Sequence, residues 1–433
     1  MNANERGWPL LLAQALVAAA AGATEPGAEP APLEGELAGP AAIKFASAAR
    51  LNYTRSDKVL SDERHFVLST FETKASYDLS SSLRAALQLR ASAILAPGTR
   101  SQVDFPYAYL DWRTTAADFR IGKQILAWGK TDALNPTDIV TPRNYTTLLP
   151  FDEDERSGVW GARGTYYVTD TVAATLFFGT RFKPSTLPFA SRGAQQYRFD
   201  ADGAKKRQVG VRVAVTRDDI DFSVSAYHGA SLLAQAERAE TRAGTHTVFL
   251  RYPTIDMVGA DLARNFGKFG MRIEAAAVRP VRGEATATGL RPYRYLVAGM
   301  DRTFFSDLNV NVQLFGRWTD PAPGRAGACG CVDAMGAELT GLNGLIFVQS
   351  RRRTQGMTFR VANQWMNQTL SAEVFVQHYF GDNSTYVHPM ATYALSDRTR
   401  ITAGAVWYGG NEGSLFGVMK KNRSVFSELR YSF

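Results

Sequence analysis

The chain has 433 residues, with 49 Lys and Arg against 41 Asp and Glu, and its mean hydropathy is −0.19. Beyond the N-terminus no apolar run approaches the roughly 20 residues that a membrane-spanning helix needs, which excludes a helical membrane protein. The positive charge is moderate and dispersed, with Arg351, Arg352 and Arg353 as its densest group, and this argues against a nucleic-acid surface.

The first 23 residues have the layout of a secretory signal peptide. Arg6 supplies a charged region, Trp8 to Ala20 is apolar, and Ala21-Gly22-Ala23 is a small-residue cleavage site. The alternative is a helix of the mature fold. We expect cleavage after Ala23, then a flexible periplasmic lead-in at 24–41 and a single barrel domain at 42–433.

From Ile43 to the C-terminus the chain alternates apolar and polar residues with a period of two, which is a strand signal. In 83–95, for example, Leu87 falls on the face expected toward lipid, and Gln88 and Arg90 fall on the opposite face. We count about 18 such segments (about 16 would also fit), in which turns of two to four residues alternate with longer loops. The sequence therefore predicts an all-β fold, a transmembrane antiparallel β-barrel with long extracellular loops.

Further signals accompany this pattern. Segment 118–128 is expected to be one strand, and Pro106 predicts a bulge or a loosely paired position in the strand before it. The final segment alternates up to Phe433, and a C-terminal strand ending in Phe resembles the assembly signal of Gram-negative outer-membrane proteins. Aromatic residues cluster near strand ends, as interfacial girdles require. We therefore expect outer-membrane lipid and, through Phe433, the barrel-assembly machinery as partners.

Twelve arginines alternate with the rows expected to face lipid, and so should point inward. They are Arg50, Arg84, Arg90, Arg120, Arg163, Arg181, Arg212, Arg272, Arg317, Arg360, Arg400 and Arg430. A dry interior could not hold so many charges unpaired, but a water-filled lumen can. One interpretation is that they are paired or solvated residues that hold the lumen open. The other is that they favour anions, as rings of charged side chains do in pores.

The connection between Asp118 and Trp160 contains about 27 residues without a sustained strand period. A compact domain rarely carries so long a connection without a use for it. We predict a constriction loop, either folded into the lumen opposite the arginines or solvated outside the barrel. Its candidate residues are the turn-forming and charged positions Asn135, Asp138, Arg143, Asp152, Glu153, Asp154 and Glu155.

Few residues point to catalytic or metal chemistry. Cys329 and Cys331 could close a local disulfide after export, or bind a metal, although two thiolates without a nearby His make a poor site. His378 and His388 lie near one external hairpin and could meet, but no G-x-S-x-G elbow is present. We expect no enzyme activity, no metal and no cofactor.

Residues 120–138 carry motifs of a known family. They read R-x-G-x-Q-x-x-x-W-G-K, followed by N-P-x-D, and in this they resemble large Gram-negative outer-membrane barrels classed as a domain of unknown function. Segment 179–188 is similar to a P-F-x-x-P-S-x-x-P hairpin of that family, although its first proline is missing. The barrel is also broadly similar to alginate-export porins. The resemblance implies an outer-membrane location and a loose association with lipid-like or aromatic compounds.

These observations predict an outer-membrane, porin-like channel for passive transfer of small, anionic or amphipathic solutes. The alternative is a carrier or exporter of lipid-like or aromatic compounds. An adhesin or structural barrel and a barrel phospholipase fit less of the pattern. No nucleic acid is expected as a partner. The solute, the direction of transfer and the oligomeric state stay open.

Overall fold

The structure is a computed structural model, and its described residues are 43–57, 64–95, 100–145, 156–187, 194–199, 206–284, 286–305, 307–321, 334–411 and 414–433. The expected signal peptide and lead-in, the acidic run 152–155 and both cysteines lie outside the described residues. Within the described part of the chain, no helix combines the length and the apolar character needed to cross a membrane.

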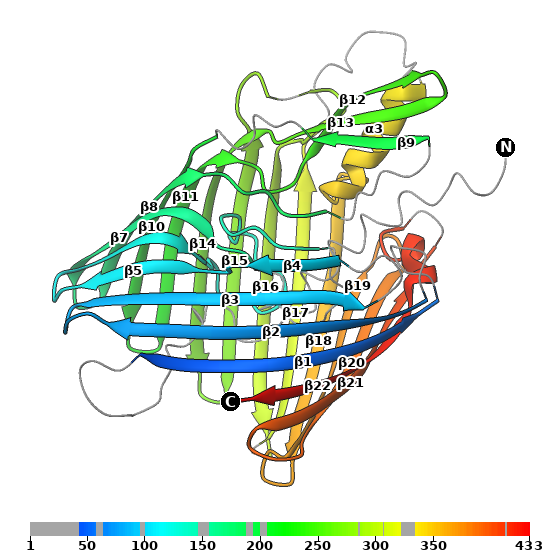
Figure 1. The fold of residues 1–433 in the computed structure, drawn as a ribbon. Coiled ribbons are helices and arrows are strands. Elements are labelled where there is room, and N and C mark those ends of the chain that lie inside the picture. Colours follow the sequence, from blue (N-terminus) through cyan, green and yellow to red (C-terminus); the bar gives the residue numbers. More distant parts are fainter. Residues whose placement is uncertain are drawn as a thin grey trace.

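The chain forms a closed antiparallel barrel of 18 strands, which confirms the predicted fold class and strand number (Figure 1). The barrel segments are β1 (Lys44–Ser56), β2 (His65–Asp78), β3 (Leu83–Leu95), β4 (Arg100–Asp104), β5 (Ala108–Arg113), β6 (Ala117–Gln124), β7 (Val159–Thr169), β8 (Val172–Arg181), β10 (Gln208–Arg217), β11 (Ile220–Ala230), β14 (Thr254–Phe266), β15 (Phe269–Pro280), β16 (Tyr293–Phe304), β17 (Leu308–Thr319), β18 (Arg353–Trp365), β19 (Leu370–Tyr379), β20 (Ser384–Ala394), β21 (Thr399–Gly409) and β22 (Ser424–Ser432). β4 and β5 make one barrel strand, interrupted around Pro106, and β1 pairs with β22 to close the wall.

Side chains alternate between the lumen and the outside, because a strand has a period of two. In β1, Leu51 is 48% exposed on the outside, whereas Arg50 and Asn52 are buried inside. In β3, Leu87 is exposed and Gln88 is buried. The predicted inside and outside rows are therefore correct in these strands.

The two ends of the barrel differ. At one end, here called the turn end, strands are joined by two to four residues; at the other, the loop end, most connections are longer. The loop end carries elements that the sequence analysis did not predict: β9 (Gln195–Phe199), β12 (Gln235–Arg242), β13 (Thr245–Arg251), α3 (Ala334–Ile346) and η2 (Gly417–Asn422). Short turns face the periplasm in outer-membrane barrels, so we assign the loop end to the outside.

A small sheet and a helix lie over one side of the loop end (Figure 1). β13 pairs antiparallel with β12 and parallel with β9. Leu339 of α3 packs into the buried cluster of this sheet with Val248 and Leu250. Asn343 of α3 holds the helix on β12, because its side-chain oxygen accepts from the backbone nitrogen of Ala236 (2.8 Å) and its amide donates to the carbonyl of the same residue (2.7 Å).

β6 ends at Gln124, four residues earlier than the predicted strand 118–128. Two residues before this end, Gly122 has a φ of +130°, and an added Cβ there would lie 2.3 Å from the carbonyl oxygen of Ala108. Only glycine fits so close an approach with such a φ. Beyond Gln124 the chain leaves the wall, and Leu126 is buried in the interior.

Candidate functional site

Residues 125–145, here called the lumen segment, follow β6 into the interior of the barrel (Figure 1). Trp128 is 4% exposed and packs on β10, where an added Cβ on Gly210 would lie 2.6 Å from its ring. Leu126 and Val140 belong to the same buried cluster as inner-wall side chains of β8 and β14. The described part of the predicted constriction loop therefore lies in the lumen and not outside the barrel.

Glu274 of β15 anchors the lumen segment. Its fully buried carboxylate accepts hydrogen bonds from the backbone nitrogens of Lys130 (3.0 Å), Thr131 (3.2 Å) and Thr137 (2.7 Å), and from both threonine hydroxyls (2.8 Å each). Gly129 permits this approach, since an added Cβ would lie 2.5 Å from the carboxylate. A buried carboxylate requires such donors, so the conformation of the segment and the burial of Glu274 depend on each other.

A second carboxylate, Asp132, connects the lumen segment to β15 and β17. Asp132 lies 3.2 Å from the guanidinium of Arg272 and accepts a hydrogen bond from Asn311, while the backbone nitrogen of Ala133 donates to Gln313 (3.4 Å). Burial raises the pKa of Asp132 above its ordinary value, and the nearby Arg272 opposes this shift. The segment is thus fixed to both β15 and β17.

Asp138 joins the two ends of the loop. One of its carboxylate oxygens lies 3.0 Å from Arg143 and 2.9 Å from Arg156, and the two arginines also pair through their backbones. The side-chain oxygen of Asn135 lies 3.1 Å from the Thr131 hydroxyl, and its backbone carbonyl accepts from the Asp138 nitrogen (3.2 Å). Asn135, Asp138 and Arg143, the described members of the predicted constriction set, therefore all hold the shape of the loop.

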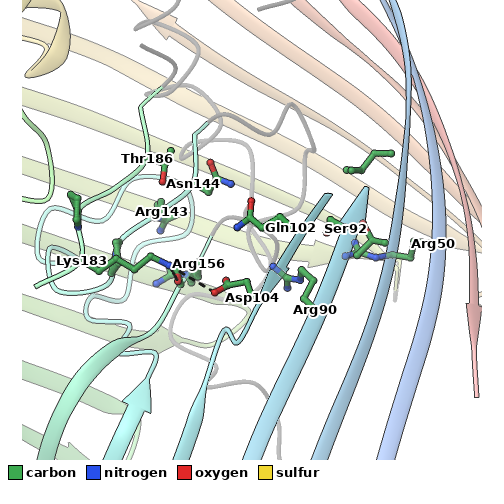
Figure 2. A pocket seen from close by; sticks show the side chains of 15 residues that line it. Arg50, Arg90, Ser92, Gln102, Asp104, Arg143, Asn144, Arg156, Lys183 and Thr186 are labelled. Carbon is green, nitrogen blue, oxygen red and sulfur yellow. Dashed lines mark hydrogen bonds and ion pairs between the residues drawn. The ribbon is translucent and has the colours of Figure 1, made fainter. Parts of the chain in front are cut away.

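A polar cavity of about 100 Å³, here called the basic pocket, lies between the ion pairs of Asp138 with Arg143 and Arg156 and the wall formed by β1 to β4 (Figure 2). Its charged lining residues are Arg50, Arg90, Asp104, Arg143, Arg156 and Lys183. Five of the six are cationic. Burial lowers the pKa of Lys183, and Asp104, 3.9 Å away, opposes this shift. The lining of the basic pocket is therefore mainly cationic, with Asp104 as its one acidic residue.

The two wall arginines of the basic pocket belong to a larger charged cluster. Arg50, Arg90 and Arg430 lie 3.8, 3.7 and 3.6 Å from oxygens of one buried carboxylate, Glu72. Arg50 is also 4.0 Å from Glu428. Two carboxylates do not neutralise three guanidinium groups, so this cluster stays cationic.

Most of the other predicted arginines form ion pairs with carboxylates. The inward ion pairs are Arg84 with Asp78, Arg120 with Asp111, Arg212 with Asp261, Arg272 with Asp301, and Arg360 with Glu373. Arg163 lies opposite Arg120, Arg400 lies opposite Arg430, and Arg317 stacks on Tyr293 at 3.6 Å. Arg181 departs from the prediction, because it is exposed at the end of β8, where pairing with β7 shifts register.

Sequence reasoning missed two cations of the basic pocket. Lys183 follows β8, and its Nζ donates to Ser157 (2.6 Å) inside the lumen. Arg156 follows the acidic run 152–155 in the sequence. Neither residue lies in a segment with strand alternation. Their positions in the sequence therefore do not show that both line the same cavity. The sequence signal for Lys183 is its position within segment 179–188.

His378 and His388, which could have met near one hairpin, lie apart in the structure. In the hairpin of β19 and β20, His388 lies opposite Phe375 and is fully buried on the inner side. His378 lies opposite Thr385, on the other face of the sheet, and hydrogen-bonds to its hydroxyl (2.8 Å). The register thus separates the two side chains. Among the described residues no group of three potential metal ligands is found.

A second cavity, of about 150 Å³, lies on the other side of Arg143 toward the loop end and is here called the apolar pocket. Its apolar lining includes Ile139, Leu233, Ile255, Val278, Leu290 and Phe347. Arg143 and Arg317 also line it, and the Nε atom of Arg317 is buried without a hydrogen-bond partner in the described part of the chain. The two cavities thus share Arg143.

The chain is similar to solved structures of the same architecture. Acinetobacter baumannii OccAB3 is 7% identical with a TM-score of 0.56, over 90% of this chain and 99% of that one. Pseudomonas aeruginosa OccD3 (OpdP) is 10% identical with a TM-score of 0.54, over 95% of both chains. Pseudomonas aeruginosa OpdQ is 11% identical with a TM-score of 0.54, over 90% of this chain and 98% of that one. These likenesses show the fold, which matches outer-membrane porin structures.

A family model covers most of the chain. The family described as "Protein of unknown function (DUF1302)" matches residues 97–407. This range includes the motifs at 120–138, the lumen segment and most of the wall. No curated protein matched the chain.

Proposed function

The chain belongs to the DUF1302 family of proteins of unknown function, and from this premise we propose that it is a porin-like channel for passive transfer of small organic anions. The observation that carries this proposal is the basic pocket, where five cations and one carboxylate line a cavity beside the lumen segment. Charged side chains around a constriction set the ion preference of a pore.

The arrangement of the cations favours a carboxylate over a simple halide. Arg50 and Arg90 approach the pocket from the wall, and Arg143 and Arg156 approach it from the loop (Figure 2). A guanidinium presents paired donors that match the two oxygens of a carboxylate. Asp104 keeps one negative charge in the same cavity, which weakens anion binding. Transfer requires such moderate affinity, because the solute must also leave.

Vesicle permeation tests the proposal. Gluconate, glucitol and glucamine share one polyol chain and differ in a terminal carboxylate, hydroxyl or ammonium group. In vesicles that contain the barrel, we expect gluconate to pass fastest and glucamine slowest. Replacing Arg90 and Lys183 together by Gln should reduce the difference, since both line the basic pocket.

The matched control is Arg84→Gln with Arg360→Gln. Both residues point inward and lie outside the basic pocket, so the same charge is lost and the solute order should persist. Glucamine passing as fast as gluconate, or no permeation above protein-free vesicles, would overturn the proposal.

The apolar pocket favours a second candidate function, transfer of amphipathic anions. An apolar chain could occupy the cavity lined by Ile139, Leu233 and Val278, while its carboxylate meets Arg143 or Arg317. Burial of each methylene contributes about 0.8 kcal/mol, so affinity should rise with chain length.

Competition distinguishes this candidate from a simple anion pore. Octanoate should block gluconate permeation at far lower concentration than acetate, and Leu233→Gln should abolish that difference. Equal potency of the two acids on the native protein would leave only the small-anion channel.

The export route belongs to the same proposal. A signal peptide cleaved after Ala23 would deliver the chain to the periplasm. Phe433, the residue proposed to contact the assembly machinery, exchanges backbone hydrogen bonds with Ser47 (3.0 and 2.9 Å) and packs on Phe71 and Tyr431. Since Phe433 lies at the closing seam, Phe433→Ala should lower the yield of assembled barrel in cells, while Phe266→Ala at another turn-end position should not.

A further inference from the structure

Charged residues collect on the outer face of the barrel at its loop end, where lipid-facing strands meet the loops. His228 of β11, Asp256 of β14 and Arg279 of β15 are direct cross-strand neighbours. Nδ1 of His228 lies 2.8 Å from one oxygen of Asp256, and Arg279 lies 3.3 Å from the other. The side chain of Arg279 is 72% exposed, so most of its donors face away from the protein.

The next strands of the wall continue the row. Arg294 of β16 lies opposite Trp318 of β17, which lies opposite Arg353 of β18. Arg279 is a diagonal neighbour of Arg294, since Ala277 is the residue opposite Arg294. We call this set the outer patch; its members are His228, Asp256, Arg279, Arg294, Trp318 and Arg353, on adjacent strands of the wall (Figure 1).

The surface below the outer patch is apolar. Toward the turn end on the same strands, Val224, Val258, Leu296 and Leu314 are 43%, 62%, 40% and 58% exposed on the outer face. Such a surface faces the hydrocarbon layer. The outer patch therefore begins where the hydrocarbon ends, at the depth of the lipid headgroups, which is also where Trp is enriched in membrane proteins.

We propose that the outer patch binds the phosphate groups of an outer-leaflet glycolipid. Three guanidinium groups and one carboxylate leave the patch positive. Arginine matches phosphate oxygens in bidentate geometry, and cations at a membrane surface are attracted to anionic headgroups. Asp256 has a positioning role, since it holds Arg279 and His228 side by side. This surface faces away from the lumen, so the inference is independent of solute transfer.

Binding of a defined lipid to the detergent-solubilised full chain tests the inference. The probes are lipid A with two phosphates, the same lipid with its phosphates removed, and phosphatidylglycerol. We expect the native barrel to bind the bisphosphorylated lipid at least about tenfold more tightly than the dephosphorylated one, because cations at a membrane surface are attracted to anionic headgroups. Phosphatidylglycerol should bind more weakly than the bisphosphorylated lipid, since it carries one phosphate.

A matched pair of variants locates the site. Arg279→Gln with Arg294→Gln removes two charges from the outer patch and should lower affinity for bisphosphorylated lipid A about tenfold. Arg264→Gln with Arg302→Gln removes two charges from the outer face at the turn end, where both side chains lie over phenylalanine rings, and affinity should persist. Replacing Arg279 and Arg294 by Lys should give intermediate affinity. This variant takes the place of the Gln variant in the binding test if the Gln variant assembles poorly. Equal loss in both double variants, or equal binding of phosphorylated and dephosphorylated lipid, would overturn the inference.

Discussion

Thr137 and Glu274 are joined by two hydrogen bonds inside the barrel, one from the backbone nitrogen (2.7 Å) and one from the hydroxyl (2.8 Å) of the threonine. The two residues are 137 positions apart in the chain. Their contact holds the lumen segment against β15, at a point where the carboxylate is fully buried.

Glu274→Gln should loosen the lumen segment without unfolding the barrel. The amide keeps one acceptor oxygen, but it loses the charge and half of its acceptor capacity, and hydrogen bonds to charged groups contribute about 1.5–3 kcal/mol each. We expect faster proteolysis within 125–158 and more fluctuation of single-channel current. Glu373→Gln is the control, since Glu373 also points inward but pairs with Arg360 of the neighbouring strand. Identical proteolysis of the two variants would show that Glu274 is not the anchor.

Deleting residues 137–152 should widen the pore. The deletion removes Thr137, Asp138 and Arg143 but no residue of a barrel strand, so the wall should assemble. Conductance should rise and ion selectivity should fall. A deletion of 242–244, at the tip of the β12–β13 hairpin, should leave both unchanged because that hairpin lies at the loop end. If the 137–152 variant conducts like the native protein, the lumen segment is not the constriction.

Leu87→Arg should impair assembly, whereas Gln88→Arg should not. Leu87 is 39% exposed on the lipid side, and an arginine near the bilayer midplane costs about 2–4 kcal/mol. Gln88 points inward beside Glu72 (3.5 Å), so an arginine at this position stays off the lipid face. Unfolding in lipid vesicles by denaturant measures the difference. Equal stability of the two variants would contradict the assigned inside and outside rows of β3.

Most of the wall could be predicted from the sequence because its signal is local. Alternation alone places Leu51 outside and Arg50 inside, and short turns set the register of each hairpin. The same reasoning failed at β6, whose predicted end at Trp128 lies inside the lumen. The apolar residues Leu126 and Trp128 look like lipid-facing residues, but they are buried against the inner wall.

The candidate site was predictable only in part. Arg50 and Arg90 follow the strand period, and Arg143 was chosen from the long loop. The partners Lys183 and Arg156 depend on contacts between distant segments, such as the pairing of Asn144 with Thr186, which no period reveals. The loop-end sheet was missed for a similar reason, since β9 and β13 are distant in the chain and pair as parallel neighbours.

The central claim is that the basic pocket makes this barrel selective for anions, and the zero-current potential in a salt gradient tests it most directly. In a planar bilayer with tenfold different KCl on the two sides, the sign of that potential should show chloride moving more readily than potassium, most clearly at low salt, where charges are least screened. Arg90→Gln with Lys183→Gln should move the potential toward zero, because two positive charges are removed from the basic pocket. Glu72 and Asp104 keep Arg50 and Lys123 as partners, so neither carboxylate is left unpaired. Arg264→Gln with Arg302→Gln, outside the lumen, should leave it unchanged. A potential of the opposite sign in the native protein would contradict the account.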